Sequence, residues 1–115
     1  MKKFALLAAL AAAAAPAQGA GPYTVRESGG SFPRLQEAVD AIGSGSGTIV
    51  IAPGVYRDCA VQERGRIAFV AARPGAVTFR GRICEDKAAL VLRGRSALVE
   101  GIIFEGLHVP DGNGS

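Results

Sequence analysis

The sequence predicts an all-β fold: a solenoid of short strands whose first turn is covered by a single helix. Three observations support this fold class. From residue 48 onward, short runs of β-branched and aromatic residues alternate with glycine-rich turns. A Phe-x-Gly pattern at Phe79 returns 25 residues later at Phe104. An amphipathic helical pattern stands just before the first strong strand, where a stack of rungs needs a cover.

The first 20 residues have the three-part layout of a secretory signal peptide. Lys2 and Lys3 give a positive start, residues 4–15 form an unbroken apolar run, and residues 16–20 form a zone rich in small residues. The run is shorter than the roughly 20 residues that span a bilayer, so cleavage is favoured over a retained anchor. We therefore predict a secreted or periplasmic protein with no membrane attachment after residues 1–20 are removed.

Removal of this segment changes the charge of the chain. The full sequence has 13 basic and 10 acidic residues, a formal charge of +3, and the loss of Lys2 and Lys3 leaves 11 basic against 10 acidic residues. The mature chain has no block of Lys or Arg of the kind that binds a phosphate backbone. We therefore expect no nucleic-acid partner.

The exported chain contains two cysteines, Cys59 and Cys84. An oxidising compartment favours a disulfide between them over two buried free thiols. This bond closes a loop of about 25 residues, which corresponds to a stabilisation on the order of 3 kcal/mol.

Residues 21–47 are predicted to hold a short extended segment and a capping helix. The extended segment covers 22–27, and a Ser-Gly-Gly turn ends it. Ser31 is the expected N-cap of the helix, and Gly43 is expected to close it in the left-handed conformation. A flexible Gly/Ser connector, 43–47, follows. Apolar residues recur at helical spacing, at Leu35, Ala38, Val39 and Ile42.

Residues 48–115 are predicted to be strands of successive rungs. Val77 matches Ile102 at the same offset of 25, while the strands at Ile49 and Ile67 are 18 apart and those at Ile67 and Leu92 are 25 apart. An antiparallel sandwich or barrel also shows short strands and regular turns. The solenoid is favoured because the strands echo one another and the helix is placed to cover its open first turn. The predicted strands cover 48–51, 66–70, 76–79, 90–92 and 101–104, with turns at 53–54 and 74–75.

Two stretches resemble a known family. The run Leu35-Gln36-Glu37-Ala38-Val39-Asp40-Ala41, followed by Thr48-Ile49-Val50-Ile51-Ala52-Pro53-Gly54-Val55-Tyr56-Arg57-Asp58, is similar to the N-terminal entry of the pectin-lyase-like right-handed parallel β-helix superfamily. In that entry, clear in pectinesterases, a capping helix leads into a strand that ends in a Gly-x-Tyr turn. Here Asp58 stands where Glu is more usual, and residues 85–91 and 99–104 look more like bacterial right-handed β-helix repeat proteins.

The resemblance implies that residues 48–115 are the first rungs of a right-handed parallel β-helix that acts on or binds an acidic polysaccharide such as pectin or another uronan. The catalytic groups of the family lie on later rungs, and no position here matches them. We therefore predict no catalytic, cofactor-binding or metal-binding residue in this chain, and Ca²⁺ only in a longer protein. The chain is expected to be truncated after Ser115, and whether the whole is an enzyme stays open. The alternative is a non-catalytic, adhesin-like surface β-helix that serves as a binding module.

A few polar residues are candidates for chemistry, each with a simpler structural interpretation. Glu85-Asp86 has two interpretations, a metal or substrate contact and a solvated turn after Cys84. We favour the turn. His108, the only histidine, is the one residue that a Ser-His-Asp triad can use. No G-x-S-x-G motif accompanies it, and a surface position before Pro110 is favoured.

Four arginines flank the predicted strands and can form a stripe that faces an acidic polysaccharide. Outward positions of strands whose alternate residues face inward explain them more simply. The tripeptide that begins at Asn113 matches the glycosylation pattern and is interpreted as a chance match. The four arginines are Arg80, Arg82, Arg93 and Arg95.

Overall fold

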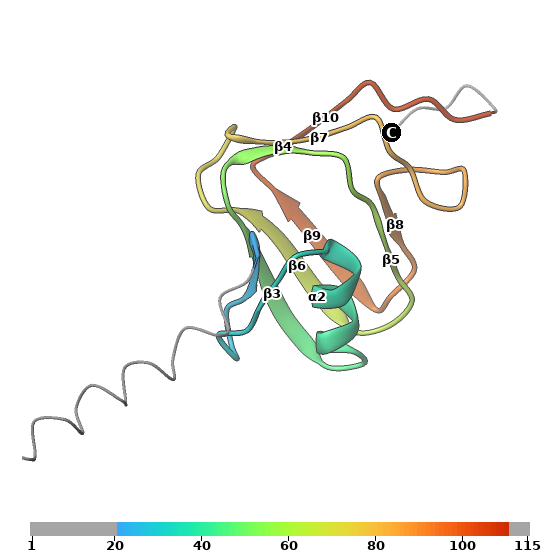
Figure 1. Cartoon of the computed structure of the whole chain (residues 1–115). Helices are drawn as coiled ribbons and strands as arrows, with labels where there is room; N and C mark the ends of the chain where they lie inside the picture. The colour runs from blue at the N-terminus through green and yellow to red at the C-terminus, as the bar shows by residue number, and fades with distance from the viewer. Residues whose placement is uncertain (1–20, 111–115) are drawn as a thin grey trace, which may run out of the picture.

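The computed structural model describes residues 21–110 and shows a strand-rich chain with one short helix in that range (Figure 1). The predicted signal peptide and the tripeptide at Asn113 lie outside the described residues. The elements are β1 Tyr23–Val25, β2 Ser31–Phe32, α2 Leu35–Ile42, β3 Ser46–Ile51, β4 Gly54–Tyr56, β5 Ala60–Gln62, β6 Arg66–Ala71, β7 Val77–Arg80, β8 Leu90–Leu92, β9 Ser96–Glu100 and β10 Ile102–Glu105.

The strands form three sheets. The largest has the order β2-β1-β3-β6-β9, the second β10-β7-β4 and the third β5-β8. The pairs β3–β6, β6–β9, β4–β7, β7–β10 and β5–β8 are parallel. β1 is antiparallel to both of its neighbours, β2 and β3. The strands β8, β9 and β10 are therefore edges of the three sheets within the described chain.

The predicted fold class is wrong. The described residues form a small compact domain of three small sheets that together hold parallel and antiparallel pairs, without the winding of a solenoid, and this is not a parallel β-helix. The antiparallel sandwich or barrel is not observed either, because most strand pairs are parallel. A repeated sequence pattern indicates which strands pair in register, and it does not by itself dictate how the chain winds.

The sequence repeat at an offset of 25 is confirmed, because the repeated residues are partners in a parallel strand pair. Phe104 pairs with Phe79 and Ile102 pairs with Val77 in the β10–β7 ladder. The offset predicted between the strands of Ile49 and Ile67 is wrong, and so is the pairing predicted between the strands of Ile67 and Leu92. Ile49 lies opposite Phe69, an offset of 20, and the strand of Leu92 pairs with β5 and not with β6. Strands that are joined by loops of unequal length do not keep one constant offset along the chain.

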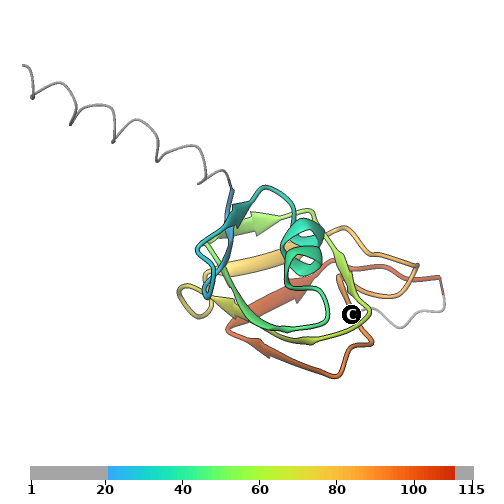
Figure 2. The ribbon, with the colours of Figure 1, turned by 90° about the horizontal axis from the view of Figure 1, so that it is seen from below.

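The predicted helix and its C-terminal end at Gly43 are confirmed, but its predicted N-cap is wrong. Gly43 closes α2 with a φ of 61° and donates its N–H to the carbonyl of Val39. Ser31 lies in β2, while Arg34 occupies the N-cap position with an extended backbone and no capping side-chain bond. The helix packs on β1, β2, β3 and β5, on the side away from the orange C-terminal strands in Figure 2.

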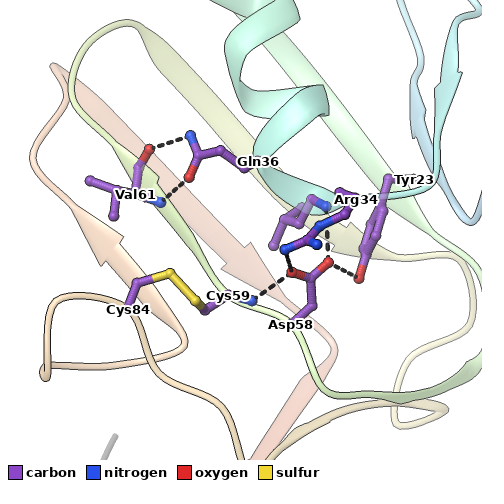
Figure 3. Close-up of a disulfide and its surroundings, with 8 residues drawn as sticks. Tyr23, Arg34, Gln36, Asp58, Cys59, Val61 and Cys84 are labelled. Atoms are coloured by element: carbon purple, nitrogen blue, oxygen red, sulfur yellow. Dashed lines mark hydrogen bonds and ion pairs between the residues drawn. A yellow bond between two sulfur atoms is a disulfide. The ribbon is translucent and has the colours of Figure 1, made fainter.

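The side chain of Gln36 pairs with the backbone of β5. Its Nε2 donates to the carbonyl of Val61 at 3.0 Å, and its Oε1 accepts the N–H of Val61 at 2.8 Å (Figure 3). The amide thus makes the two bonds that a neighbouring strand makes to one residue of a ladder. The helix covers this end of the sheets through polar bonds as well as apolar contacts.

Four strands, β2, β4, β5 and β9, were not among the predicted ones, and β3 begins at Ser46, inside the predicted connector. Gly47 explains this last difference. An ideal Cβ at Gly47 lies 2.7 Å from Cδ1 of Ile42, so glycine here lets β3 pass close under the helix. The glycine serves packing at this position and not flexibility.

The apolar core continues through the domain as a column of aromatic rings. The ring centroids of Tyr23 and Tyr56 are 5.5 Å apart, those of Tyr56 and Phe79 5.6 Å, and those of Phe79 and Phe104 5.9 Å. These separations are typical of favourable aromatic pairs. Tyr56, Phe79 and Phe104 come from three successive strands of one sheet, so the parallel register builds the column.

Candidate anion-binding site

Asp58 is a buried carboxylate beside the N-terminus of α2. Its Oδ2 accepts hydrogen bonds from the Tyr23 hydroxyl and from the N–H of Leu35, both at 3.0 Å, and its Oδ1 accepts the N–H of Cys59 at 2.8 Å. Nη2 of Arg34 lies 3.7 Å from Oδ1 (Figure 3). A buried charge is tolerated when it is paired and hydrogen-bonded, and Asp58 meets both conditions.

A cavity of about 260 Å³ opens over this carboxylate. Three of its lining residues carry a guanidinium group and one carries a carboxylate, so the charges of the lining sum to +2. Arg34 is already an ion-pair partner of Asp58, while Arg57 and Arg82 form no ion pair within residues 21–110. The lining residues are Tyr23, Pro33, Arg34, Val55, Tyr56, Arg57, Asp58 and Arg82.

The predicted disulfide is confirmed, and it ties together the two segments that carry Arg57 and Arg82. Cys59 and Cys84 are bonded, with their Cα atoms 5.7 Å apart (Figure 3). Each of the two arginines stands two residues before one of these cysteines. The bond therefore holds the two arginine-bearing segments at one cavity.

Gly81 leaves room for the Arg57 guanidinium. An ideal Cβ at Gly81 lies 2.8 Å from Nη1 and 3.1 Å from Cζ of Arg57, and the backbone of Gly81 has a φ of 77°. A side chain at this position is unfavourable both for its backbone and for the guanidinium. Glycine here keeps Arg57 at the cavity.

The four arginines predicted from the sequence have different surroundings. Arg80 pairs with Glu105, and Arg93 pairs with both Glu63 and Glu85. Arg82 lines the cavity, whereas Arg95 is exposed and is not part of the lining. The four do not form a single stripe. Arg34 and Arg57, which line the cavity with Arg82, were not predicted.

Arg93 lies between two carboxylates at the surface. Its guanidinium donates to Glu63 and to Glu85, and these bonds lower the pKa of both carboxyl groups. Glu85 and Asp86 form an exposed turn with φ values of 53° and 55°. The acidic pair therefore forms the solvated turn favoured from the sequence, and Glu85 is ion-paired with Arg93.

The other candidate, His108, is exposed in the segment after β10 and does not line the cavity. Residues 21–110 contain no cluster of three or more His, Cys, Asp or Glu side chains that can hold a metal ion. In the same part of the chain, no helix is long and apolar enough to cross a membrane.

The two tyrosines of the cavity are held in the protonated form. Burial, and then the neighbouring Asp58 carboxylate, raise the pKa of Tyr23. Burial also raises the pKa of Tyr56, whose hydroxyl donates to the carbonyl of Ala52 at 2.5 Å. Both hydroxyl protons are thus already donated within the protein, and the cavity offers a ligand its cations beside a carboxylate whose oxygens already accept bonds, a set that suits an anion.

Comparison with known proteins adds no relative: no family model, curated protein or solved structure matches this chain. Membership of the pectin-lyase-like superfamily stays a prediction from the sequence. Only the chemistry of the cavity bears on function.

Proposed function

We propose that this protein binds an acidic polysaccharide of the uronan class outside the cytoplasm, and that the cavity of Arg34, Arg57 and Arg82 takes a carboxylate of the sugar chain. The observation that carries the proposal is the pair Arg57 and Arg82, which line one cavity and have no carboxylate partner in the described chain. The planar guanidinium fork matches a carboxylate and binds it through two parallel hydrogen bonds.

The size and lining of the cavity fit one residue of a longer polymer. A volume of about 260 Å³ is slightly below the roughly 300–1,000 Å³ of ordinary small-molecule sites. Val55 and Tyr56 supply apolar surface beside the three cations. A charged sugar has both a carboxylate and an apolar ring face, so it can use both parts of the lining.

Two further features support location and role. The disulfide is expected in an oxidising, extracytoplasmic compartment, which agrees with the predicted signal peptide. Binding is proposed and not catalysis, because Asp58 is the only carboxylate of the lining and both of its oxygens accept hydrogen bonds. A general base needs an oxygen that is free to take a proton from the substrate.

Calorimetric titration of the disulfide-bonded protein with oligogalacturonate tests the proposal, with the fully methyl-esterified oligomer as the neutral counterpart. We expect binding of the acidic oligomer alone, weakened by salt because the contact is charged. Arg57→Gln and Arg82→Gln each remove a charged hydrogen bond worth about 1.5–3 kcal/mol, so each lowers affinity roughly tenfold or more.

Arg26→Gln is the matched control, since it removes the same charge from an exposed position outside the cavity and away from β9. Its affinity for the acidic oligomer should stay within about twofold of that of the unaltered protein. Equal binding of the esterified oligomer, or undiminished binding by the Arg57→Gln/Arg82→Gln double variant, contradicts the proposal.

A further inference from the structure

The core of the domain is uncovered at the end where β8, β9 and β10 form the sheet edges. All five residues of β9 are exposed, whereas in β6 buried positions alternate with accessible ones. The register shows what this means for the core. Val99 lies opposite Phe69, and Phe69 is fully buried while Val99 is 37% exposed. An inward-facing position of β9 therefore has no layer above it in the described chain.

The same end holds an apolar hollow of about 220 Å³, lined by Leu90, Leu92, Val99 and Phe104. Phe104 is the last ring of the aromatic column, with Phe79 stacked on one side of it. Leu98 and Ile103 are exposed as well, at 54% and 42%, but as chain neighbours of Val99 and Phe104 they face the opposite sides of their strands. An open apolar hollow at the edges of the sheets indicates an interaction site.

The outer edge of β9 lacks most of the features that keep edge strands apart, and its one charged residue, Glu100, stands at its end. Its sequence, Ser96-Ala97-Leu98-Val99-Glu100, contains no Lys, Arg or Pro, which commonly block edge-to-edge pairing.

We propose that this end docks a second copy of the chain, with β9 of each copy antiparallel to β9 of the other and centred on Leu98. Leu98 then faces Leu98, Ala97 faces Val99 and Ser96 faces Glu100 across the pair. Apolar residues meet apolar residues, and no like charges stand opposite each other.

The charges at the two ends of β9 are complementary in this arrangement. Arg95 immediately precedes the strand and Glu100 ends it, and both are exposed. Antiparallel pairing places the positive end of one β9 next to the negative end of the other. A parallel pair instead sets Arg95 near Arg95 and Glu100 near Glu100, which is unfavourable.

An interface at this end leaves the arginine cavity free. The cavity is lined by Val55 of β4 and by residues just before α2, and β4 is separated from β10 by β7. The pair would therefore carry two such cavities, and a polymer that reaches both binds with avidity. This last point alone rests on the proposed function, whereas the pairing through β9 does not.

Sedimentation equilibrium of the disulfide-bonded protein over a range of concentrations tests the proposal. We expect a species of two chains and none larger. Leu98→Lys places two ammonium groups face to face at the centre of the interface and should raise the dissociation constant at least tenfold. Val55→Lys is the matched control, because Val55 is 60% exposed in β4, outside the interface, and should leave the dimer intact.

A crosslinking variant tests the register independently. Side chains that face each other in an antiparallel pair have Cβ atoms about 4.5–5.5 Å apart, so Leu98→Cys should yield a covalent dimer under mild oxidation, and Val55→Cys should not. A chain that is monomeric at all concentrations, forms open-ended aggregates, or dimerises without any Leu98→Cys crosslink contradicts the proposal. Circular dichroism of each variant establishes that it is folded.

Discussion

The carboxylate of Asp58 accepts the backbone N–H of Leu35 at 3.0 Å, and this bond joins the first turn of α2 to the arginine cavity. A helix begins with N–H groups that have no partner within the helix, and a side chain at the N-cap usually accepts one of them. Here the acceptor comes from 23 residues further along the chain. The negative charge also suits the positive end of the helix dipole.

Replacement of Asp58 should therefore cost more than an ordinary surface change. Asp58→Ala leaves the Leu35 N–H and the Tyr23 hydroxyl without their acceptor inside the protein, and we expect a loss of about 3 kcal/mol in the free energy of unfolding. Asp40→Ala, at an exposed position of the same helix, should cost about 0.5 kcal/mol or less. Urea unfolding of both variants measures the difference, and equal losses would show that Asp58 does not cap the helix.

Alkaline pH should destabilise the domain through Tyr23. Burial and Asp58 raise the pKa of Tyr23 in the folded protein above the usual value of about 10. The folded state thus holds this proton more tightly than the unfolded chain does. The resulting stability is fully present below about pH 10 and falls as the pH rises beyond it.

Tyrosinate absorbance, followed together with circular dichroism, checks this expectation. Tyr23 should ionise only as the protein unfolds. The sequence has two tyrosines, so Tyr23→Phe leaves Tyr56 as the only source of the signal. The alkaline loss of stability should be smaller in this variant. An ordinary titration of Tyr23 in the folded protein would refute the expectation.

The disulfide should stabilise both the fold and the cavity. Its removal in a Cys59→Ser/Cys84→Ser variant frees a loop with a sequence separation of 25, and we expect a loss of about 3 kcal/mol. Under mild conditions that keep this variant folded, its affinity for oligogalacturonate should fall, because Arg57 and Arg82 are no longer held together. Purified protein that shows two alkylatable thiols without reductant would contradict the bond itself.

Loss of a ring from the aromatic column should cost more stability in its buried middle than at its open end. Phe79 is fully buried between two rings, so Phe79→Ala should cost about 3–5 kcal/mol. Phe104 is only partly buried at the end of the column, and Phe104→Ala should cost less than half as much in the monomer. Thermal unfolding at low protein concentration measures both. A larger cost at Phe104 would mean that the column is not open at this end.

Local patterns in the sequence predicted the helix and most of the long strands. The spacing of Leu35, Ala38 and Val39 marks the face of α2 that is buried, and Gly43 marks its end. The echo of Phe79 at Phe104 is a true register, because both rings fill equivalent places in one column. The buried face and the end of a helix, and the position of a ring within a strand, depend on residues close by in the sequence.

Features that depend on distant partners were not predictable in the same way. Ser31 looked like the N-cap, but the acceptor that the helix uses is Asp58. Arg34 and Arg57 gave no signal, since only tertiary structure brings them beside Arg82. The fold class failed for a related reason: strand similarity carries no information about the antiparallel pairing of β1, which makes the largest sheet mixed.

The amide of Gln36 limits how many molecules can join by strand addition. It occupies both backbone groups of Val61 that an incoming strand would use, and β2, at the far edge of the largest sheet, offers only two residues. A protein with two receptive edges grows into fibres, whereas one with a single receptive edge stops after one partner. One glutamine side chain thus closes β5 to strand addition and removes one of the edges through which copies of the chain could join.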